Sequence, residues 1–416
     1  MATESTMTPH RFLFVTWEGG GNVPPILGLA RRLVERGHSV RVISDPCNEG
    51  EVKAAGCAFT AYSRAPHRSD KSVGSTLAKD YEGSPVAGLR SFVKTFWSPT
   101  FAQDVLEELT TRPVDVCCVN DVLISALFAP EKAGIHTVLL MPNCNTLLPG
   151  PGVGFKGKAN VALQAFLFQH IILSQGMDDL RNTRKALGLP PLRDLYAYMY
   201  QLSKVLIMTS RAFDSKAEVA PNYQYIGPIL DDPTWTEAWQ SPWCFDSPDP
   251  LVVVSLSTTY QHQEEVLQKV LDAVDGLKVR VLVTLGPALD QTQFRIPANV
   301  VVRASVPHTQ VFPLASVVVS HGGHGTVTRA LASGVPLVCI PFGRDQPNNA
   351  AYVVAEGAGL KRDKKASVAS IREAIQRVVK EPAFRENARQ LGKTLAEDAC
   401  SPTGVQALEQ IAATVS

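Results

Sequence analysis

A glycine-rich segment close to position 320 carries the residues with the most specific chemistry in this sequence. It follows an apolar run at 315–320 that predicts a buried strand, and it precedes helical sequence at 327–333. A strand that ends in such a turn leaves backbone N–H groups unpaired at the positive end of a helix dipole, where anions bind. The segment reads Ser320-His321-Gly322-Gly323-His324-Gly325-Thr326.

The residue types inside this turn suit a phosphate or diphosphate ligand. Its three glycines lack a Cβ that would keep a phosphate at a distance. Thr326 adds a hydroxyl donor, and His321 can donate through an imidazole nitrogen. Glycines at a strand-to-helix junction also occur in plain tight turns, so the pattern alone leaves both interpretations open.

A second polar group follows the next predicted strand, the apolar run 334–341. Just past its end comes Phe342-Gly343-Arg344-Asp345-Gln346. Ligands of open α/β sheets bind beyond the carboxyl ends of the strands, so we expect this group to face the same crevice as the glycine turn. A carboxylate beside a carboxamide can accept from and donate to sugar hydroxyls, although a solvated loop would have a similar composition.

The elements that hold these residues form two α/β halves in tandem. Strand 11–16, a glycine turn at 18–22, helix 24–36 and strand 39–44 make a βαβ unit that opens a parallel sheet. Further strands are predicted at 114–119, 137–141, 204–208, 251–256, 280–284 and 300–302.

The chain has 416 residues, about right for two domains of roughly 200 residues each. We expect a doubly wound N-terminal domain at 1–220, a polar connection at 221–250 and a second doubly wound domain at 251–400. A last helix at 401–416 can dock back on the first domain. Residues 150–204 are helical and rich in aromatic side chains, which indicates either a layer on the sheet or an insertion that lines a substrate cleft.

Composition narrows the class of partner. Forty basic and thirty-nine acidic residues give a formal charge of +1, so no global field attracts nucleic acid or an anionic membrane, and we expect a small-molecule partner. We find no membrane-span candidate and no signal-peptide pattern, and therefore expect a cytoplasmic protein without integral membrane association. The eight cysteines lack metal-site spacing and indicate buried free thiols.

The sequence resembles the family 1 glycosyltransferases of the GT-B fold, inverting enzymes that glycosylate natural products such as macrolides, flavonoids and other polyphenols. The resemblance covers nearly the whole chain. Its most specific part runs from Val306-Pro307-His308 through HGGHGTVTRALASGVPLVCIPFGRDQPNNAAYVVAEGAG, which is similar to the family's donor-binding signature. It implies an α/β protein in which two Rossmann-like parallel-sheet domains face a central cleft.

The resemblance also implies a role for each matching residue. Ser305, Val306 and His308 would border the nucleobase of a nucleoside-diphosphate sugar. Asp345 and Gln346 would hold the sugar hydroxyls. The remaining donor contacts implied at or near the diphosphate are Thr258, His321, Gly323, His324, Gly325 and Thr326.

Arg329 departs from the family pattern in the donor site. Eight residues after the motif histidine the family often has a glutamate that binds the ribose hydroxyls, and this chain has Arg329 there. UDP-linked and dTDP-linked donors therefore both stay open.

A second departure concerns the catalytic base. The family's histidine stands three residues before a proline in the loop after the first strand, and aligning Pro25 puts Asn22 in its place. A carboxamide is no base at neutral pH, whereas Asp121 matches the family's partner aspartate and could act as base if burial raised its pKa. Three alternatives stay open: Asn22 positions an acidic phenol or an activated aromatic carbon for C-glycosylation, Glu18 is the base, or Asp121 merely caps a helix.

The implied reaction is a direct displacement that inverts the anomeric carbon while the nucleoside diphosphate leaves. The helix dipole, backbone N–H groups and His321 would stabilise the leaving group, and because no Asp-x-Asp follows a strand we expect neither a metal nor a cofactor. An apolar aromatic or polyketide-like acceptor would pack near Phe155, Phe166, Phe168 and Tyr198.

Two other classes of function share parts of this pattern. A sugar-nucleotide 2-epimerase has the same two-domain fold and a diphosphate site, but needs acid and base groups around the sugar C2. A non-catalytic auxiliary homologue would tolerate the loss of the usual histidine.

Overall fold

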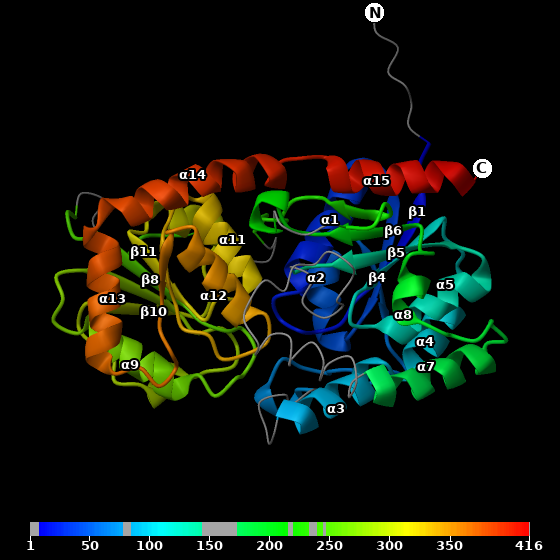
Figure 1. The fold of residues 1–416 in the computed structure, drawn as a ribbon, viewed down its shortest axis with the longest axis horizontal. Helices are drawn as coiled ribbons and strands as arrows, with labels where there is room; N and C mark the ends of the chain where they lie inside the picture. The colour runs from blue at the N-terminus through cyan, green and yellow to red at the C-terminus, as the bar shows by residue number, and fades with distance from the viewer. Residues whose placement is uncertain are drawn as a thin grey trace, which may run out of the picture.

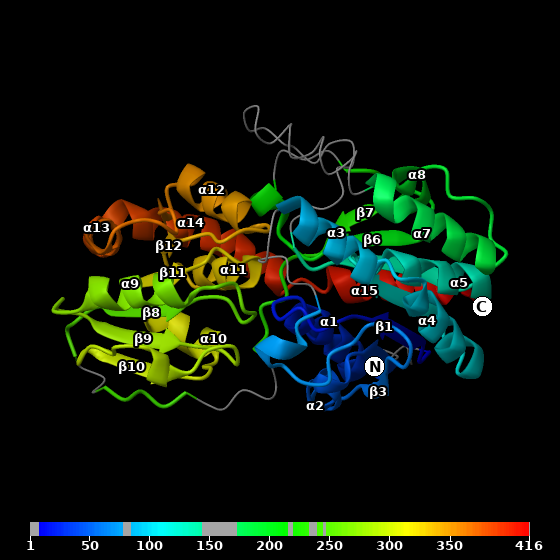
Figure 2. The same ribbon diagram turned by 90° about the horizontal axis from the view of Figure 1, so that it is seen from below.

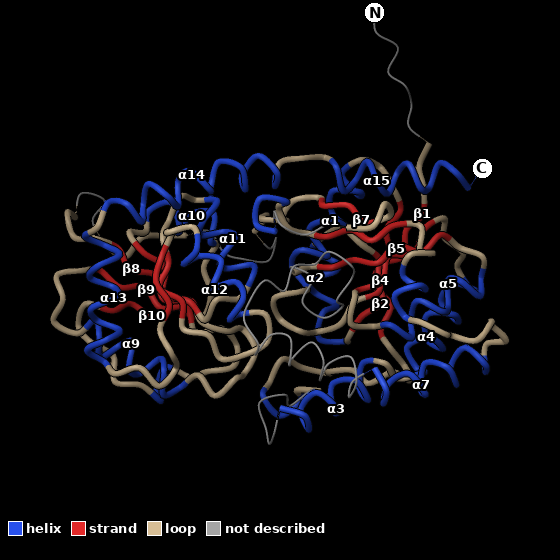
Figure 3. Tube along the Cα trace, in the orientation of Figure 1, coloured by secondary structure: helices blue, strands red, loops and turns tan. Residues whose placement is uncertain are grey.

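The computed structural model of the chain shows two parallel-sheet domains side by side (Figure 1). It describes residues 8–77, 85–143, 173–214, 219–232, 239–243 and 247–415. The strands form the centre of each domain and the helices surround them (Figure 3). The expected class of two Rossmann-like α/β domains is confirmed.

The N-terminal sheet has seven parallel strands in the order β3-β2-β1-β4-β5-β6-β7. This order places β1 beside β4, with Val15 opposite Val119, so the loops after these two strands leave the sheet together. The strands are β1 (Arg11–Val15), β2 (Ser39–Ser44), β3 (Ala58–Ala61), β4 (Val116–Asn120), β5 (His136–Met141), β6 (Lys204–Ile207) and β7 (Tyr223–Tyr225).

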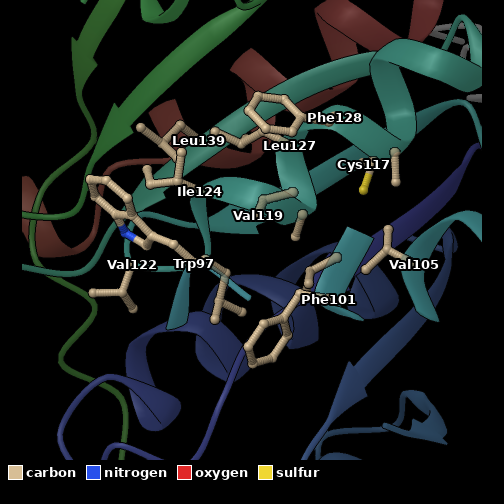
Figure 4. Close-up of a cluster of buried hydrophobic side chains, with 14 of the residues drawn as sticks. Trp97, Phe101, Val105, Cys117, Val119, Val122, Ile124, Leu127, Phe128 and Leu139 are labelled. Carbon is tan, nitrogen blue, oxygen red and sulfur yellow. The ribbon is translucent and has the colours of Figure 1, made fainter. Parts of the chain in front are cut away.

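The two faces of this sheet are covered by different helices, because successive side chains of a strand point to opposite sides. Phe12 and Phe14 pack with α1 (Val23–Glu35) and α15 (Thr403–Ala412). Leu13 and Val15 pack in a second apolar cluster, part of which is drawn in Figure 4. The helices on that face include α3 (Pro85–Phe96), α4 (Pro99–Thr111), α5 (Phe128–Ala133), α7 (Leu173–Ala186) and α8 (Leu195–Met199).

The C-terminal sheet repeats the plan with six parallel strands in the order β10-β9-β8-β11-β12-β13. The strands are β8 (Leu251–Ser255), β9 (Arg280–Thr284), β10 (Val300–Arg303), β11 (Val317–Ser320), β12 (Leu337–Cys339) and β13 (Gly359–Lys361). Helices α9 (Glu264–Val274) and α13 (Val368–Lys380) cover one face. The other face carries α10 (His308–Val311), α11 (His324–Ala332), α12 (Gln346–Ala355) and α14 (Pro382–Ala399).

The last helices join the two domains. Figure 1 shows α14 running along the C-terminal domain and continuing into α15, which lies on the N-terminal domain against α1. The guanidinium of Arg32 on α1 is 3.0 Å from the carboxylate of Asp231 and donates to the Ala399 carbonyl at 3.1 Å. Arg32 therefore contacts both of the segments that connect the domains, the one that contains Asp231 and the one that follows α14.

Two sequence expectations differ from the structure in detail. Helix α11 begins at His324 rather than Val327, so Gly325 and Thr326 already belong to its first turn. The edge strands β3, β7 and β13 are not among the predicted strands, because each is short and only partly buried and so lacks a long apolar run.

The described cysteines, which exclude Cys144 and Cys244, are all free thiols. No helix in that part of the chain is both long enough and apolar enough to cross a membrane.

Candidate active site

The turn between β11 and α11 has the geometry of an anion site. Gly322 has a φ of +88°, which favours glycine, and Gly323 is the N-cap of α11. The backbone N–H groups at the start of α11 consequently point out of the first turn. A Cβ on Gly323 would lie 2.5 Å from Nε2 of His321, so a side chain there would collide with the imidazole.

His321 is held neutral at physiological pH. The pKa of its imidazole is lowered to about 4, first by burial and then by the nearby charge of Arg344. A hydrogen bond to the Ser255 carbonyl partly opposes both effects. A neutral imidazole has a single N–H, and the Ser255 carbonyl accepts it. The ring therefore adds no positive charge to the turn.

Asp345 lies over the start of α11. Its carboxylate accepts the backbone N–H of His324 and, at 2.8 Å, the side-chain amide of Asn349. Burial raises the pKa of this carboxyl group. The loop after β12 and the glycine turn thus meet in one place.

Gln346 is placed differently from the sequence expectation. Its side chain is buried, and its Oε1 accepts the backbone N–H groups of Phe342 at 2.8 Å and Gly343 at 3.2 Å. Its amide group donates to Oε1 of Gln261 at 2.9 Å. Because donor and acceptor are both engaged within the protein, this carboxamide shapes the loop around Asp345 rather than facing the crevice.

The predicted nucleobase residues lie together at the start of α10. Ser305 is exposed and Val306 is buried in the domain core. The His308 ring stacks on Phe312 with centroids 4.2 Å apart and planes at 17°, and burial lowers its pKa to about 3. An exposed hydroxyl beside an apolar wall and a neutral ring is a surface on which a base can stack.

Arg329 and His324 contact segments outside the glycine turn. Arg329 donates to the carbonyls of Gly325 at 3.3 Å and of Asp231, between the domains, at 3.2 Å. The His324 ring donates to the Met208 carbonyl and packs edge-on against Phe213. His324 therefore offers its backbone N–H to the site, while its imidazole lies at the junction with the N-terminal domain.

Asn22 and Asp121 lie in the loops that follow the paired strands β1 and β4. Trp17, after β1, donates its indole N–H to Oδ1 of Asn120 at 3.1 Å, and Asn22 donates to the Trp17 carbonyl at 3.1 Å. Asn22 is the N-cap residue of α1, but its side chain makes no capping hydrogen bond. Its carboxamide is thus connected to the end of β4 through Trp17.

Asp121 has apolar surroundings. Figure 4 shows Val119 and Val122, its neighbours along the chain, in a cluster with Trp97 and Ile124. Burial raises the pKa of Asp121 to about 7, although its own backbone N–H and that of Val122 partly offset the effect. The 3-10 helix that follows, Ile124–Leu127, has no side-chain cap, so helix capping does not account for Asp121.

Glu18 is tied into a group of charges. Its Oε1 accepts the backbone N–H of Gly20 at 2.8 Å, and its Oε2 lies 3.1 Å from Nζ of Lys71, which also pairs with Glu51. Its backbone N–H donates to Asp45 at 2.9 Å. Both oxygens of the Glu18 carboxylate are thus engaged by groups of the protein, and this placement favours Asp121 over Glu18 as base.

The glycine turn of the N-terminal domain touches the C-terminal domain. A Cβ on Gly20, whose φ is +72°, would lie 2.5 Å from Oγ1 of Thr258 and 2.9 Å from Cγ2 of Thr259. Glu18 and Lys71 line a small pocket at this seam together with Thr258 and Thr259. Thr258 thus lies where the two domains meet rather than over the start of α11.

The acceptor side is described only in part. Phe155, Phe166 and Phe168 lie outside the described residues. Tyr198 is buried in the N-terminal core, donates to the Leu127 carbonyl at 3.2 Å and packs on Phe128. These contacts are those expected of a helical layer packed on the sheet. Within the described residues, no group of three His, Cys, Asp or Glu side chains could hold a metal ion.

Two residues near the site were not given a role from the sequence. Trp17 links Asn22 to Asn120, and Arg344 donates to Oγ1 of Thr259 at 3.2 Å. The signal for Arg344 was its position directly before Asp345 in the loop after a strand. Trp17 had no comparable signal, since its contacts depend on the pairing of β1 with β4.

Comparison with known proteins identifies the class. Residues 268–411 match the family described as erythromycin biosynthesis protein CIII-like, C-terminal domain. The chain is 28% identical to 4'-demethylrebeccamycin synthase of Lentzea aerocolonigenes over 92% of this chain and 94% of that protein.

Solved structures show the same architecture. The calicheamicin glycosyltransferase CalG4 superposes with a TM-score of 0.76 and 22% identity, over 99% of this chain and 100% of that one. The glycosyltransferase VinC, solved in complex with dTDP, gives a TM-score of 0.72 and 17% identity, over 97% of this chain and 100% of that one.

The chain is a glycosyltransferase with the GT-B fold. Residues 268–411 resemble the C-terminal domain of the erythromycin CIII-like family, and the proteins similar to this chain include a rebeccamycin synthase and a calicheamicin glycosyltransferase. The similarity to glycosyltransferases therefore favours a glycosyltransferase over the sugar-nucleotide 2-epimerase that the sequence left open.

Proposed function

We propose that this protein transfers a hexose, with inversion, from a dTDP- or UDP-linked donor to an apolar aromatic or polyketide-like acceptor. The first turn of α11 holds the diphosphate, and Asp345 accepts from the sugar hydroxyls. The similarity to 4'-demethylrebeccamycin synthase supports a natural-product acceptor. The observation that carries the proposal is the convergence of Asp345 and the glycine turn at one helix N-terminus.

Arg329 favours the dTDP-linked donor within this proposal. A guanidinium has donors but no acceptor, so it cannot accept a hydrogen bond from the ribose 2'-hydroxyl of a UDP sugar. Two of its N–H groups already serve the carbonyls of Gly325 and Asp231. VinC, a neighbour in fold, was solved with dTDP.

We assign the base to Asp121. In its ionised form the carboxylate takes the proton of an acceptor hydroxyl while that oxygen bonds to the anomeric carbon and the bond to the diphosphate breaks. A pKa of about 7 matches a base that works near neutral pH. Asn22 then positions the acceptor, and the same pair could serve an activated aromatic carbon, which makes C-glycosylation part of the proposal.

No metal is needed in this mechanism, because the helix dipole and backbone N–H groups meet the charge that develops on the leaving diphosphate. The test is a thermal-shift screen of UDP, dTDP and their sugar derivatives, followed by transfer to a panel of phenolic and polyketide acceptors with and without EDTA. We expect a larger shift with dTDP and unchanged turnover in EDTA. A larger shift with UDP would refute the nucleotide assignment, and loss of turnover in EDTA would refute metal independence.

Failure to transfer the sugar would indicate a different function. A protein that binds a donor but transfers to no acceptor would fit the auxiliary homologue instead. Conversion of the sugar nucleotide alone into an isomer would identify an epimerase. The enzyme assignment therefore depends on a glycosylated product and not on nucleotide binding.

A further inference from the structure

The carboxyl ends of β1 and β4 meet at the point where the strand order of the N-terminal sheet reverses. Strands β2 and β3 follow on one side of β1, whereas β5, β6 and β7 follow on the far side of β4. Ligands of open α/β sheets bind outside the strand ends at such a point. Trp17 and Asn22 belong to the loop after β1. Asn120 is the last residue of β4, and Asp121 follows it.

The Asn120 side chain is oriented by two donors. Its Oδ1 accepts the indole N–H of Trp17 at 3.1 Å and the backbone N–H of Val122 at 3.3 Å. Because only the oxygen of a carboxamide accepts hydrogen bonds, these contacts fix which side-chain atom is Oδ1 and which is Nδ2. The residue is fully buried, and Nδ2 has no hydrogen-bond partner among the described residues.

Asn22 presents the opposite kind of unpaired atom. Its amide group donates to the Trp17 carbonyl at 3.1 Å, and its buried Oδ1 has no donor in the part of the chain that the structure describes. A Cβ on Gly19 would lie 2.5 Å from this oxygen and 2.7 Å from Cζ2 of Trp17. The oxygen therefore lies near the edge of the indole that carries Nε1, the atom bound to Asn120.

A role in holding the loop explains only half of the Asn120 carboxamide. The contacts with Trp17 and Val122 need its oxygen but not its amide group. A buried polar atom without a partner costs about 1–3 kcal/mol, and native proteins contain few of them. The cost is offset when a bound molecule accepts from Nδ2, and the adjacent residue, Asp121, is the proposed base.

We propose that Asn120 is an acceptor-binding residue, whose Nδ2 donates a hydrogen bond to an oxygen of the acceptor beside the attacking hydroxyl. The inference rests on the proposed function, in which Asp121 takes the proton of that hydroxyl. Asn22 Oδ1 receives a second hydroxyl or an N–H of the same molecule. This pattern fits an aromatic hydroxy ketone, with a carbonyl next to the reacting hydroxyl, rather than an isolated phenol.

The experiment compares two acceptors that differ at one position. In 1-acetyl-2-naphthol a carbonyl oxygen stands beside the hydroxyl, and in 1-isopropenyl-2-naphthol a CH₂ group replaces that oxygen. We expect the kcat/KM of the wild type to be roughly 10- to 100-fold higher for the acetyl compound, because the other compound leaves a buried donor unpaired. Asn120→Ala should lose this preference, since it has no side-chain donor.

Trp17→Phe is the matched control for the structural role of Asn120. It removes the indole N–H that Asn120 accepts but keeps the Asn120 amide group. Any loss of rate should therefore be equal for the two naphthols, and the preference for the acetyl compound should persist. A cooperative thermal melt establishes that each variant is folded, and the preference of the wild type needs no variant at all.

The outcomes separate this inference from the proposed function. Equal kcat/KM of the wild type for the two naphthols would overturn the assignment of Asn120, and so would a preference that persists in Asn120→Ala. In either case a buried water alone would pair the two carboxamides. Transfer to other phenols but to neither naphthol would overturn the inferred acceptor class and leave the proposed function standing. Transfer to no acceptor would overturn both.

Discussion

Replacing Asp121 by Asn removes an ionisable group while keeping its shape. In the folded protein its pKa is about 7, against an ordinary value of 3.8, because the carboxyl is buried. This difference corresponds to a cost of roughly 4 kcal/mol for the ionised form in the folded state. An asparagine bears no such cost, and its oxygen can still accept the backbone N–H of Val122.

The sign of the stability effect follows from proton linkage. Below the unfolded pKa of 3.8 the carboxyl is neutral in both states, so ionisation costs nothing. As the pH rises toward the folded pKa of about 7, the unfolded chain ionises first and the wild type loses stability. We expect Asp121→Asn to gain roughly 2–3 kcal/mol relative to the wild type between pH 5 and pH 7, with no further gain above it.

Urea denaturation of both proteins from pH 5 to pH 8.5 measures this difference. The same substitution should lower kcat/KM by roughly 10²- to 10⁴-fold, since it removes a general base. The wild-type rate should rise about tenfold per pH unit up to pH 7 and then level off, whereas the rate of the variant should not depend on pH in this range. A stability difference independent of pH would refute the raised pKa of the Asp121 carboxyl. An undiminished rate in the variant would refute the role of Asp121 as base.

Two glycine substitutions test the geometry of the site. Gly20→Ala places a Cβ 2.5 Å from Thr258 Oγ1 at a φ of +72°, so we expect a loss of roughly 1–3 kcal/mol in urea denaturation and slower turnover. Gly21→Ala, with nothing within 4 Å of its Cβ, is the control and should stay within about 0.5 kcal/mol of the wild type. Gly323→Ala puts a Cβ 2.5 Å from the His321 ring and should weaken nucleoside diphosphate binding roughly tenfold in a titration. Equal losses for Gly20→Ala and Gly21→Ala, or undiminished binding by Gly323→Ala, would contradict these contacts.

The strands and the glycine turns were predictable from short stretches of sequence. Buried parallel strands are continuous apolar runs, as at 251–256, and glycines mark the turns after β1 and β11. The predicted start of α11 is three residues too late, because Gly325 is a poor helix former and a propensity argument begins the helix after it. The tertiary structure overrides that preference.

The partners of the polar side chains were less predictable. Asp345 and Gln346 are adjacent in the chain and were given one role, yet Asp345 contacts the start of α11 while Gln346 is buried against Gln261. Neighbouring residues at the start of a helix point in different directions, and only the packed loops decide which of them faces the crevice.

Local sequence is enough to predict the α/β class, the two tandem sheets and the position of the glycine turn after β11, because periodicity and turn chemistry depend on residues close together in the chain. Only the tertiary structure decided that Asp121 is buried to a pKa of about 7 and that Glu18 is ion-paired. Those properties depend on burial and on charges from distant segments. The physical reason is that desolvation and Coulomb interactions act between residues that are neighbours in space and not in sequence.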